Sequence, residues 1–117
     1  MNINVSTQGI RGDSGTESFV REQIQSALQR FEEQVVSVDA FLKDINGPKG
    51  GIDKQALIRV RLRNRQVIAT EIARAQLRAA VIVSVRKAKR AVRRSLKKSQ
   101  LRHRWRAGAG LTEVTES

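Results

Sequence analysis

Residues 74–100 have the sequence RAQLRAAVIVSVRKAKRAVRRSLKKSQ, and this stretch carries most of the information about the fold. Its apolar residues recur at steps of three or four, at Leu77, Val81, Val85, Ala88, Val92 and Leu96. At 3.6 residues per turn these positions fall within an arc of roughly 100°, which is the apolar stripe of an amphipathic helix. The stretch therefore predicts a helix on the order of 40 Å long that packs on a core along this stripe.

The half of this predicted helix opposite the stripe is basic. Its residues are Arg86, Lys87, Lys89, Arg90, Arg93, Arg94, Lys97 and Lys98. From Arg74 to Arg106 the chain has 13 Lys and Arg residues and no Asp or Glu. A charged stretch is usually a solvated surface, but solvated surfaces mix the two signs to limit self-repulsion. The unmixed charge therefore predicts that this face binds a polyanion.

The charge of the whole chain agrees with this interpretation and locates the binding surface. The 117 residues carry a formal net charge of +12, with 6 basic against 8 acidic residues in 1–58 and 17 against 3 in 59–117. Such a field indicates nucleic acid first and an anionic membrane surface second. A membrane is disfavoured because the apolar stripe is small and is needed for the core. The C-terminal half is expected to bind nucleic acid.

Upstream, the apolar pattern predicts four strands and a second helix. Period-two alternation indicates strands near residues 3–5, 36–43, 56–63 and 67–72, and helical spacing indicates a helix over residues 16–33. The resulting order, β-α-β-β-β-α, predicts a two-layer α+β domain with both helices packed on one face of a small sheet. The pattern leaves the strand order open.

The connections between these elements carry weaker predictions. Either Asp13 or Ser14 caps the first helix, and the sequence does not choose between them. Residues 46–51, with the single proline and three glycines, indicate a long hairpin connection. Asn64-Arg65 is interpreted as a two-residue turn. Within the second predicted strand, the period of two places Val36 on the same face as Val38. Residues 1–105 are interpreted as the domain, and 106–117 as a disordered C-terminal tail.

Several classes of function are disfavoured. The chain has no cysteine, no secretory signal and no apolar run of the 20 or so residues that span a bilayer, so it is expected to be cytoplasmic. Lys49 in its glycine-rich loop does not form a phosphate-binding motif, and His103 has neither a catalytic partner nor further metal ligands in its neighbourhood. No enzyme activity, metal, cofactor or small-molecule substrate is expected.

Three further residues have two interpretations each. Arg59 and Arg61 lie on the polar face of the third predicted strand, where they either contact RNA or only keep an exposed face charged. Trp105 either stacks on a base or covers the end of the core. Because surface aromatics of the kind that single-strand RNA modules use are lacking, recognition is expected through backbone charge and shape.

The chain resembles the bacterial ribosome hibernation-promoting factors and ribosome-associated translation inhibitors. The similarity runs over about 100 residues from Ile3 to Leu101, and its register is carried by Phe19-Val20, Leu28, Phe31, Val35-Val36-Ser37-Val38, Ala69-Thr70, Ala79-Ala80 and the basic run through Lys98. The resemblance implies a fold related to double-stranded RNA-binding domains. It also implies binding to the small ribosomal subunit and its 16S-type ribosomal RNA near the decoding region, where mRNA and tRNA are then blocked sterically under stress and in stationary phase.

The chain also departs from the family pattern. Gln76-Leu77-Arg78 stands where family members often have an acidic-aromatic segment, and the last helix lacks the acidic residues usually interleaved with the basic ones. With 117 residues the chain corresponds to a short form, without the extra domain that pairs ribosomes. A generic double-stranded RNA- or DNA-binding protein is the alternative interpretation.

Overall fold

The computed structural model describes residues 1–9, 14–44 and 54–109, with Ser14, Gln100 and residues 102–109 described by their backbone alone. The elements in chain order are β1 (Asn2–Gln8), α1 (Ser14–Leu28), a short 3-10 helix (Gln29–Phe31), β2 (Val35–Asp44), β3 (Lys54–Leu62), β4 (Val67–Arg74) and α2 (Leu77–Ala109). The predicted Asp13 cap and the connection over residues 46–51 lie outside the described residues.

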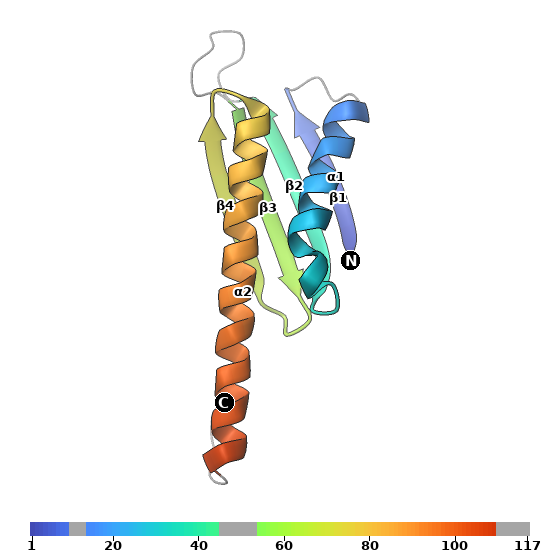
Figure 1. Ribbon diagram of the computed structural model, residues 1–117. Helices are drawn as coiled ribbons and strands as arrows, with labels where there is room; N and C mark the ends of the chain where they lie inside the picture. Colours follow the sequence, from blue (N-terminus) through green and yellow to red (C-terminus); the bar gives the residue numbers. More distant parts are fainter. Residues whose placement is uncertain (10–13, 45–53, 110–117) are drawn as a thin grey trace.

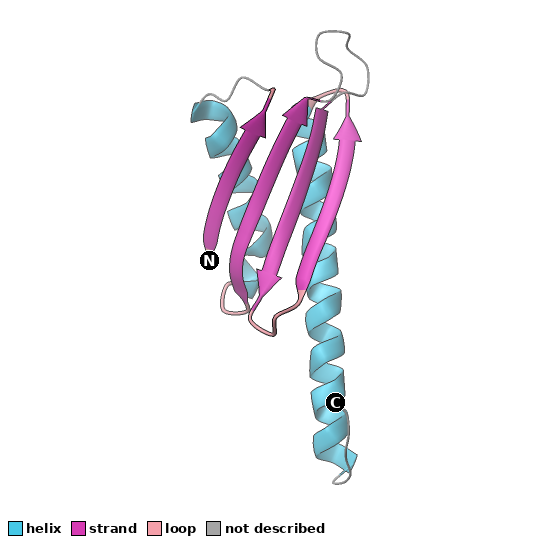
Figure 2. Ribbon diagram, turned by 180° about the vertical axis from the view of Figure 1, so that it is seen from behind, coloured by secondary structure: helices cyan, strands magenta, loops and turns pink. Residues whose placement is uncertain are grey.

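The four strands form one sheet in the order β1-β2-β3-β4. β1 runs parallel to β2, and the other two neighbouring pairs are antiparallel. Parallel neighbours need a crossover connection, and α1 provides it between β1 and β2 (Figure 1). Both helices lie on one face of the sheet and leave the other face uncovered (Figure 2). The predicted two-layer α+β class is therefore confirmed, and the structure adds the strand order.

The hydrophobic core lies between the sheet and the two helices. From α1 it includes Val20, Ile24 and Leu28, whose side chains have no exposed surface. The predicted stripe of α2 is confirmed: Val81, Val85, Ala88 and Val92 are buried, and Leu77 and Leu96 are partly buried against the core. A fully buried Val, Leu or Ile contributes roughly 1.5–3 kcal/mol, so the stripe holds α2 in one rotation about its axis.

A β-bulge in β2 changes one predicted position. The register with β3 shifts between Val35 and Ser37, and as a result Val35 is buried while Val36 is 43% exposed. A bulge adds one residue to a strand and so breaks the period of two. The prediction that Val36 shares the face of Val38 is therefore wrong.

The connection between β3 and β4 is longer than predicted. The backbone N–H of Leu62 donates to the carbonyl of Gln66 at 2.9 Å, which leaves three residues, Arg63 to Arg65, in the loop. Arg65 has a φ of 74°, the left-handed conformation that ends a three-residue hairpin loop. The predicted two-residue turn is wrong, because Arg65 adopts a conformation that the sequence pattern assigns to Gly or Asn.

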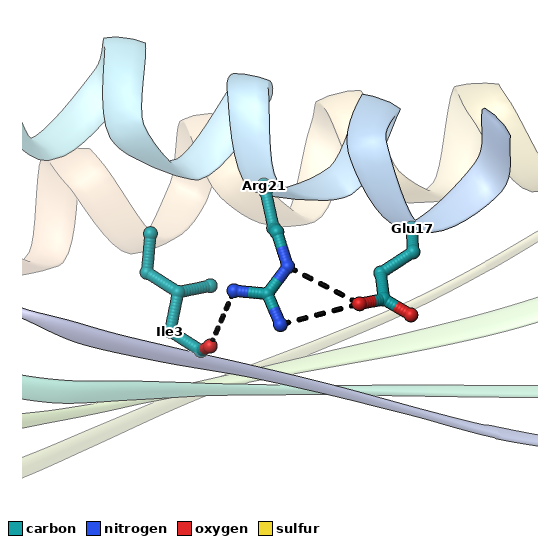
Figure 3. A network of polar contacts seen from close by, with 3 residues as sticks. All are labelled: Ile3, Glu17 and Arg21. Carbon is teal, nitrogen blue, oxygen red and sulfur yellow. Dashed lines mark hydrogen bonds and ion pairs between the residues drawn. The ribbon is translucent and has the colours of Figure 1, made fainter. Parts of the chain in front are cut away.

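A side chain of α1 covers the free edge of β1. Arg21 donates from Nη1 to the carbonyl oxygen of Ile3 at 2.7 Å, and from Nε and Nη2 to Oε2 of Glu17 at 3.3 Å each (Figure 3). β1 has β2 as its neighbour on one side only, so this contact ties the edge strand to the helical layer. An edge carbonyl occupied in this way is also less open to pairing with another chain.

A buried polar pair links α2 to β4. Thr70 Oγ1 donates to the carbonyl oxygen of Ser84 at 3.0 Å, and Ser84 Oγ donates to the carbonyl oxygen of Thr70 at 3.2 Å. Ser84 has no exposed surface. Hydrogen bonds between two fixed backbones have a narrow geometry, so this pair helps to set both the rotation and the height of α2 on the sheet.

Ser84→Ala should lower the free energy of unfolding by about 1–2 kcal/mol, because the Thr70 carbonyl loses a buried donor. The double variant Thr70→Val with Ser84→Ala should lose less free energy of unfolding than the two single variants together. Each single variant leaves the other hydroxyl without its partner, whereas the double variant removes both hydroxyls. Urea unfolding of the four proteins measures this coupling. Strictly additive losses would show that the two hydroxyls act independently.

Candidate nucleic-acid interface

The basic half of α2 faces away from the sheet. Because the apolar stripe is held on the core, the opposite side of the helix has to form the outer surface of the helical layer (Figure 1). Seven of the eight predicted residues on this side are exposed, and Lys89 is partly buried. We call this surface the outer face of α2, and it consists of Arg86, Lys87, Lys89, Arg90, Arg93, Arg94, Lys97 and Lys98.

The charges of the outer face are not neutralised within the described part of the chain. The ion pairs there join Glu17 to Arg21, Asp44 to Lys54 and Asp39 to Arg59, and none involves a residue of α2. Instead, the cations follow one another at four-residue steps along the helix, where like charges destabilise it by roughly 0.2–0.5 kcal/mol per pair. An anionic partner would relieve this repulsion, so the face is better suited to binding than to solvation.

The neighbouring helix limits the extent of the basic surface. On α1, Glu17, Arg21 and Glu22 are exposed, and Arg21 is already paired with Glu17. The helical layer is therefore basic along α2 and slightly acidic along α1. A polyanion approaching this layer would be oriented along α2 by this difference.

The structure does not bring Arg59 and Arg61 together with the outer face of α2. Both side chains belong to the uncovered face of the sheet, since their neighbours Ile58 and Val60 point into the core. Arg59 is also engaged within the sheet: its Nη2 lies 3.5 Å from Asp39 Oδ2, and its guanidinium carbon lies 5.2 Å from the centre of the Phe41 ring. The ten predicted residues thus form two separate surfaces.

The order of elements, the basic helix and the uncovered sheet can be compared with known proteins. The model of the family described as sigma 54 modulation protein / S30EA ribosomal protein matches residues 3–100. The chain belongs to this family. The S30EA family is one of ribosome-associated proteins and not a family of enzymes, which agrees with the sequence-based resemblance.

Solved structures similar to this S30EA family chain have the same fold. The N-terminal domain of Thermus thermophilus Protein Y matches with a TM-score of 0.67 and 21% identity, over 80% of this chain and 98% of that one. A ribosomal subunit interface protein from Coxiella burnetii matches with a TM-score of 0.71 and 11% identity, over 83% and 99% of the two chains. The search of curated protein sequences gave no match.

In this S30EA family chain, α2 runs further than the sequence pattern predicts. The helix was expected to end near Gln100, where the family match also ends, but it continues to Ala109. The sequence signal for this extension is the absence of Gly and Pro from residues 77–107, which leaves no helix stop before Gly108. Arg102, Arg104 and Arg106 therefore join the helix, which would be about 50 Å long.

The remaining sequence-based predictions in this region stay predictions. His103 and Trp105 lie where the backbone alone is described, and residues 110–117 of the predicted tail lie outside the described residues. Residues 106–109, which the sequence pattern assigns to the start of the tail, are instead the last turn of α2. Among the described residues there is no group of three or more side chains that could hold a metal ion, and neither helix has an apolar stretch long enough to cross a membrane.

Proposed function

We propose that this protein binds ribosomal RNA of the small subunit through the outer face of α2 and thereby inhibits translation. The observation that carries the proposal is the outer face itself, eight cations on one side of a helix without an acidic partner among the described residues. Membership of the S30EA family supports the ribosome as the partner.

The chemistry of the outer face favours contact with phosphates over reading of bases. Lys and Arg side chains on a straight helix can each neutralise a phosphate, which supplies affinity and orientation without sequence information. The specificity then has to come from the shape of the folded RNA and from the fixed position of α2 on the sheet. A rigid domain held in this way would act as a plug.

We place the plug near the decoding region, where a bound domain blocks mRNA and tRNA sterically. The partners are the small subunit and its 16S-type ribosomal RNA, the compartment is the cytoplasm, and the occasion is stress or stationary phase. In this proposal Arg86, Lys87, Lys89, Arg90, Arg93, Arg94, Lys97 and Lys98 make the main contacts. Arg59 and Arg61 would need a second RNA surface on the other side of the sheet.

Co-sedimentation of the purified protein with ribosomes and separated subunits tests the proposal. Saturable binding to the small subunit near one to one, which survives an excess of duplex RNA at near-physiological salt, is the expected result. Displacement of the protein from the small subunit by the duplex competitor would contradict the proposal.

A generic double-stranded RNA- or DNA-binding protein is the second candidate. The observation that favours it is the charge of the outer face: its eight residues are all Lys or Arg, whose contacts with phosphates carry no sequence information. Such a protein needs no ribosome, and the duplex competitor in the same experiment would remove it.

A further inference from the structure

The last turns of α2 project beyond the sheet. Ser95 contacts the side chain of Gln66 beside the β3–β4 loop, and among the α2 residues whose side chains are described, Leu96 is the last that packs on the core. Lys97, Lys98 and Leu101 are exposed, and the helix continues past the end of the sheet as far as Ala109 (Figure 1). This projecting segment, residues 97–109, explains the elongated shape of the molecule, 60 × 23 × 17 Å.

In the projecting segment, basic residues lie on the side of the helix that, earlier in α2, packs against the sheet. Arg102 and Arg106 lie about five turns beyond Ser84 and Ala88, and therefore at the same angle around the axis. Ser84 and Ala88 are buried against the sheet with no exposed surface. Arg104, by the same spacing, continues the position of the exposed Arg86. Where the sheet ends, the sequence thus replaces the core stripe with arginine and keeps the cations of the outer face.

A helix with cations on two opposite sides suits a partner with anions on two opposite sides. A solvated helix would mix the signs, yet this segment carries no acidic residue. An isolated helix of 13 residues is also marginally stable in water, and like charges along it weaken it further. A second copy of the chain is a poor occupant because it would bring the same cations together.

We propose that the projecting segment inserts into a crevice of ribosomal RNA whose phosphates flank the helix on both sides. The inference rests on the proposed function and extends it to Arg102, Arg104 and Arg106, which lie beyond the family match ending at residue 100. The outer face of α2 contacts RNA from one side, and the projecting segment is enclosed by it. Insertion would fix the depth at which the domain docks.

Two double variants of the full chain, each removing two charges, test the insertion. Arg102→Gln with Arg106→Gln changes the side that continues the core stripe, and Lys97→Gln with Arg104→Gln changes the side that continues the outer face. Binding to bacterial small subunits is measured over a salt series, together with chemical footprints on the ribosomal RNA. Each variant should lower the slope of log affinity against log salt by about two, since each lost phosphate contact is worth about one. The two variants should also lose protection at different nucleotides.

The outcomes separate this inference from the proposed function. The Arg102/Arg106 variant could keep the wild-type slope and footprint while the Lys97/Arg104 variant shows a lower slope and a reduced footprint. This result would show that RNA contacts the helix from one side only, and it would overturn the insertion but not the proposed function. Wild-type protein that fails to bind small subunits would overturn both proposals. A wild-type dimer that the stripe-side variant dissociates would assign these arginines to a protein contact. Circular dichroism of both variants verifies that the helix content is unchanged.

Discussion

Replacing Arg90, Arg93 and Arg94 with Glu should abolish binding to the small ribosomal subunit and leave the domain folded. All three side chains are exposed on the outer face of α2, so the core keeps its packing. Each reversal removes a charge-assisted contact worth about 1.5–3 kcal/mol and adds repulsion from the same phosphate. Together they should weaken binding at least about a thousandfold. Co-sedimentation measures the loss, and circular dichroism with urea unfolding measures the fold.

A second triple variant controls for net charge. Arg30, Lys43 and Arg65 are exposed, lie outside α2 and are not candidate RNA contacts, so changing them to Glu alters the charge of the protein equally. Because distant exposed charges are screened at physiological salt, this variant should retain most of the affinity. Equal losses in both variants would mean that the overall field, rather than the outer face, holds the RNA. A folded α2 variant that still binds would remove this face from the interface.

The helical part of the structure was predictable because its period is repeated many times. In α2 the apolar residues keep one stripe for five turns or more, and in α1 Val20, Ile24 and Leu28 do the same over two. The separation of Arg59 and Arg61 from α2 could also have been deduced. Alternation places them opposite Ile58 and Val60, and both helices must cover the face that Ile58 and Val60 form.

Other features could not be predicted from local patterns. Val35 and Val36 are both apolar, so two strand registers satisfy the period of two, and the pairing with β3 decides between them. The parallel pairing of β1 with β2 depends on residues that are distant in sequence, such as Val5 opposite Ala40. The left-handed conformation of Arg65 could not be predicted from the sequence, because arginine seldom adopts it and the position has no Gly or Asn to indicate it.

The affinity for small subunits should fall by roughly three to five orders of magnitude between 50 and 200 mM salt. This range corresponds to six to ten phosphates neutralised, and the outer face offers eight cations for them. Each contact releases condensed counterions, so the slope of log affinity against log salt counts the phosphates engaged. Equilibrium binding at four or more salt concentrations measures it. A slope that corresponds to one or two contacts would be too small for a helix lying along RNA.

The same series can decide whether RNA contacts one side of the domain or both. Arg59→Gln with Arg61→Gln should change the slope little, because these residues lie on the uncovered sheet face and Arg59 already pairs with Asp39. Lys87→Gln with Arg94→Gln, a matched pair on the outer face, should lower it by about two. If the Arg59/Arg61 variant lowers the slope as much as the Lys87/Arg94 variant, RNA must contact both the outer face of α2 and the uncovered face of the sheet. The domain would then be enclosed at its docking site, and the uncovered face would be part of the interface.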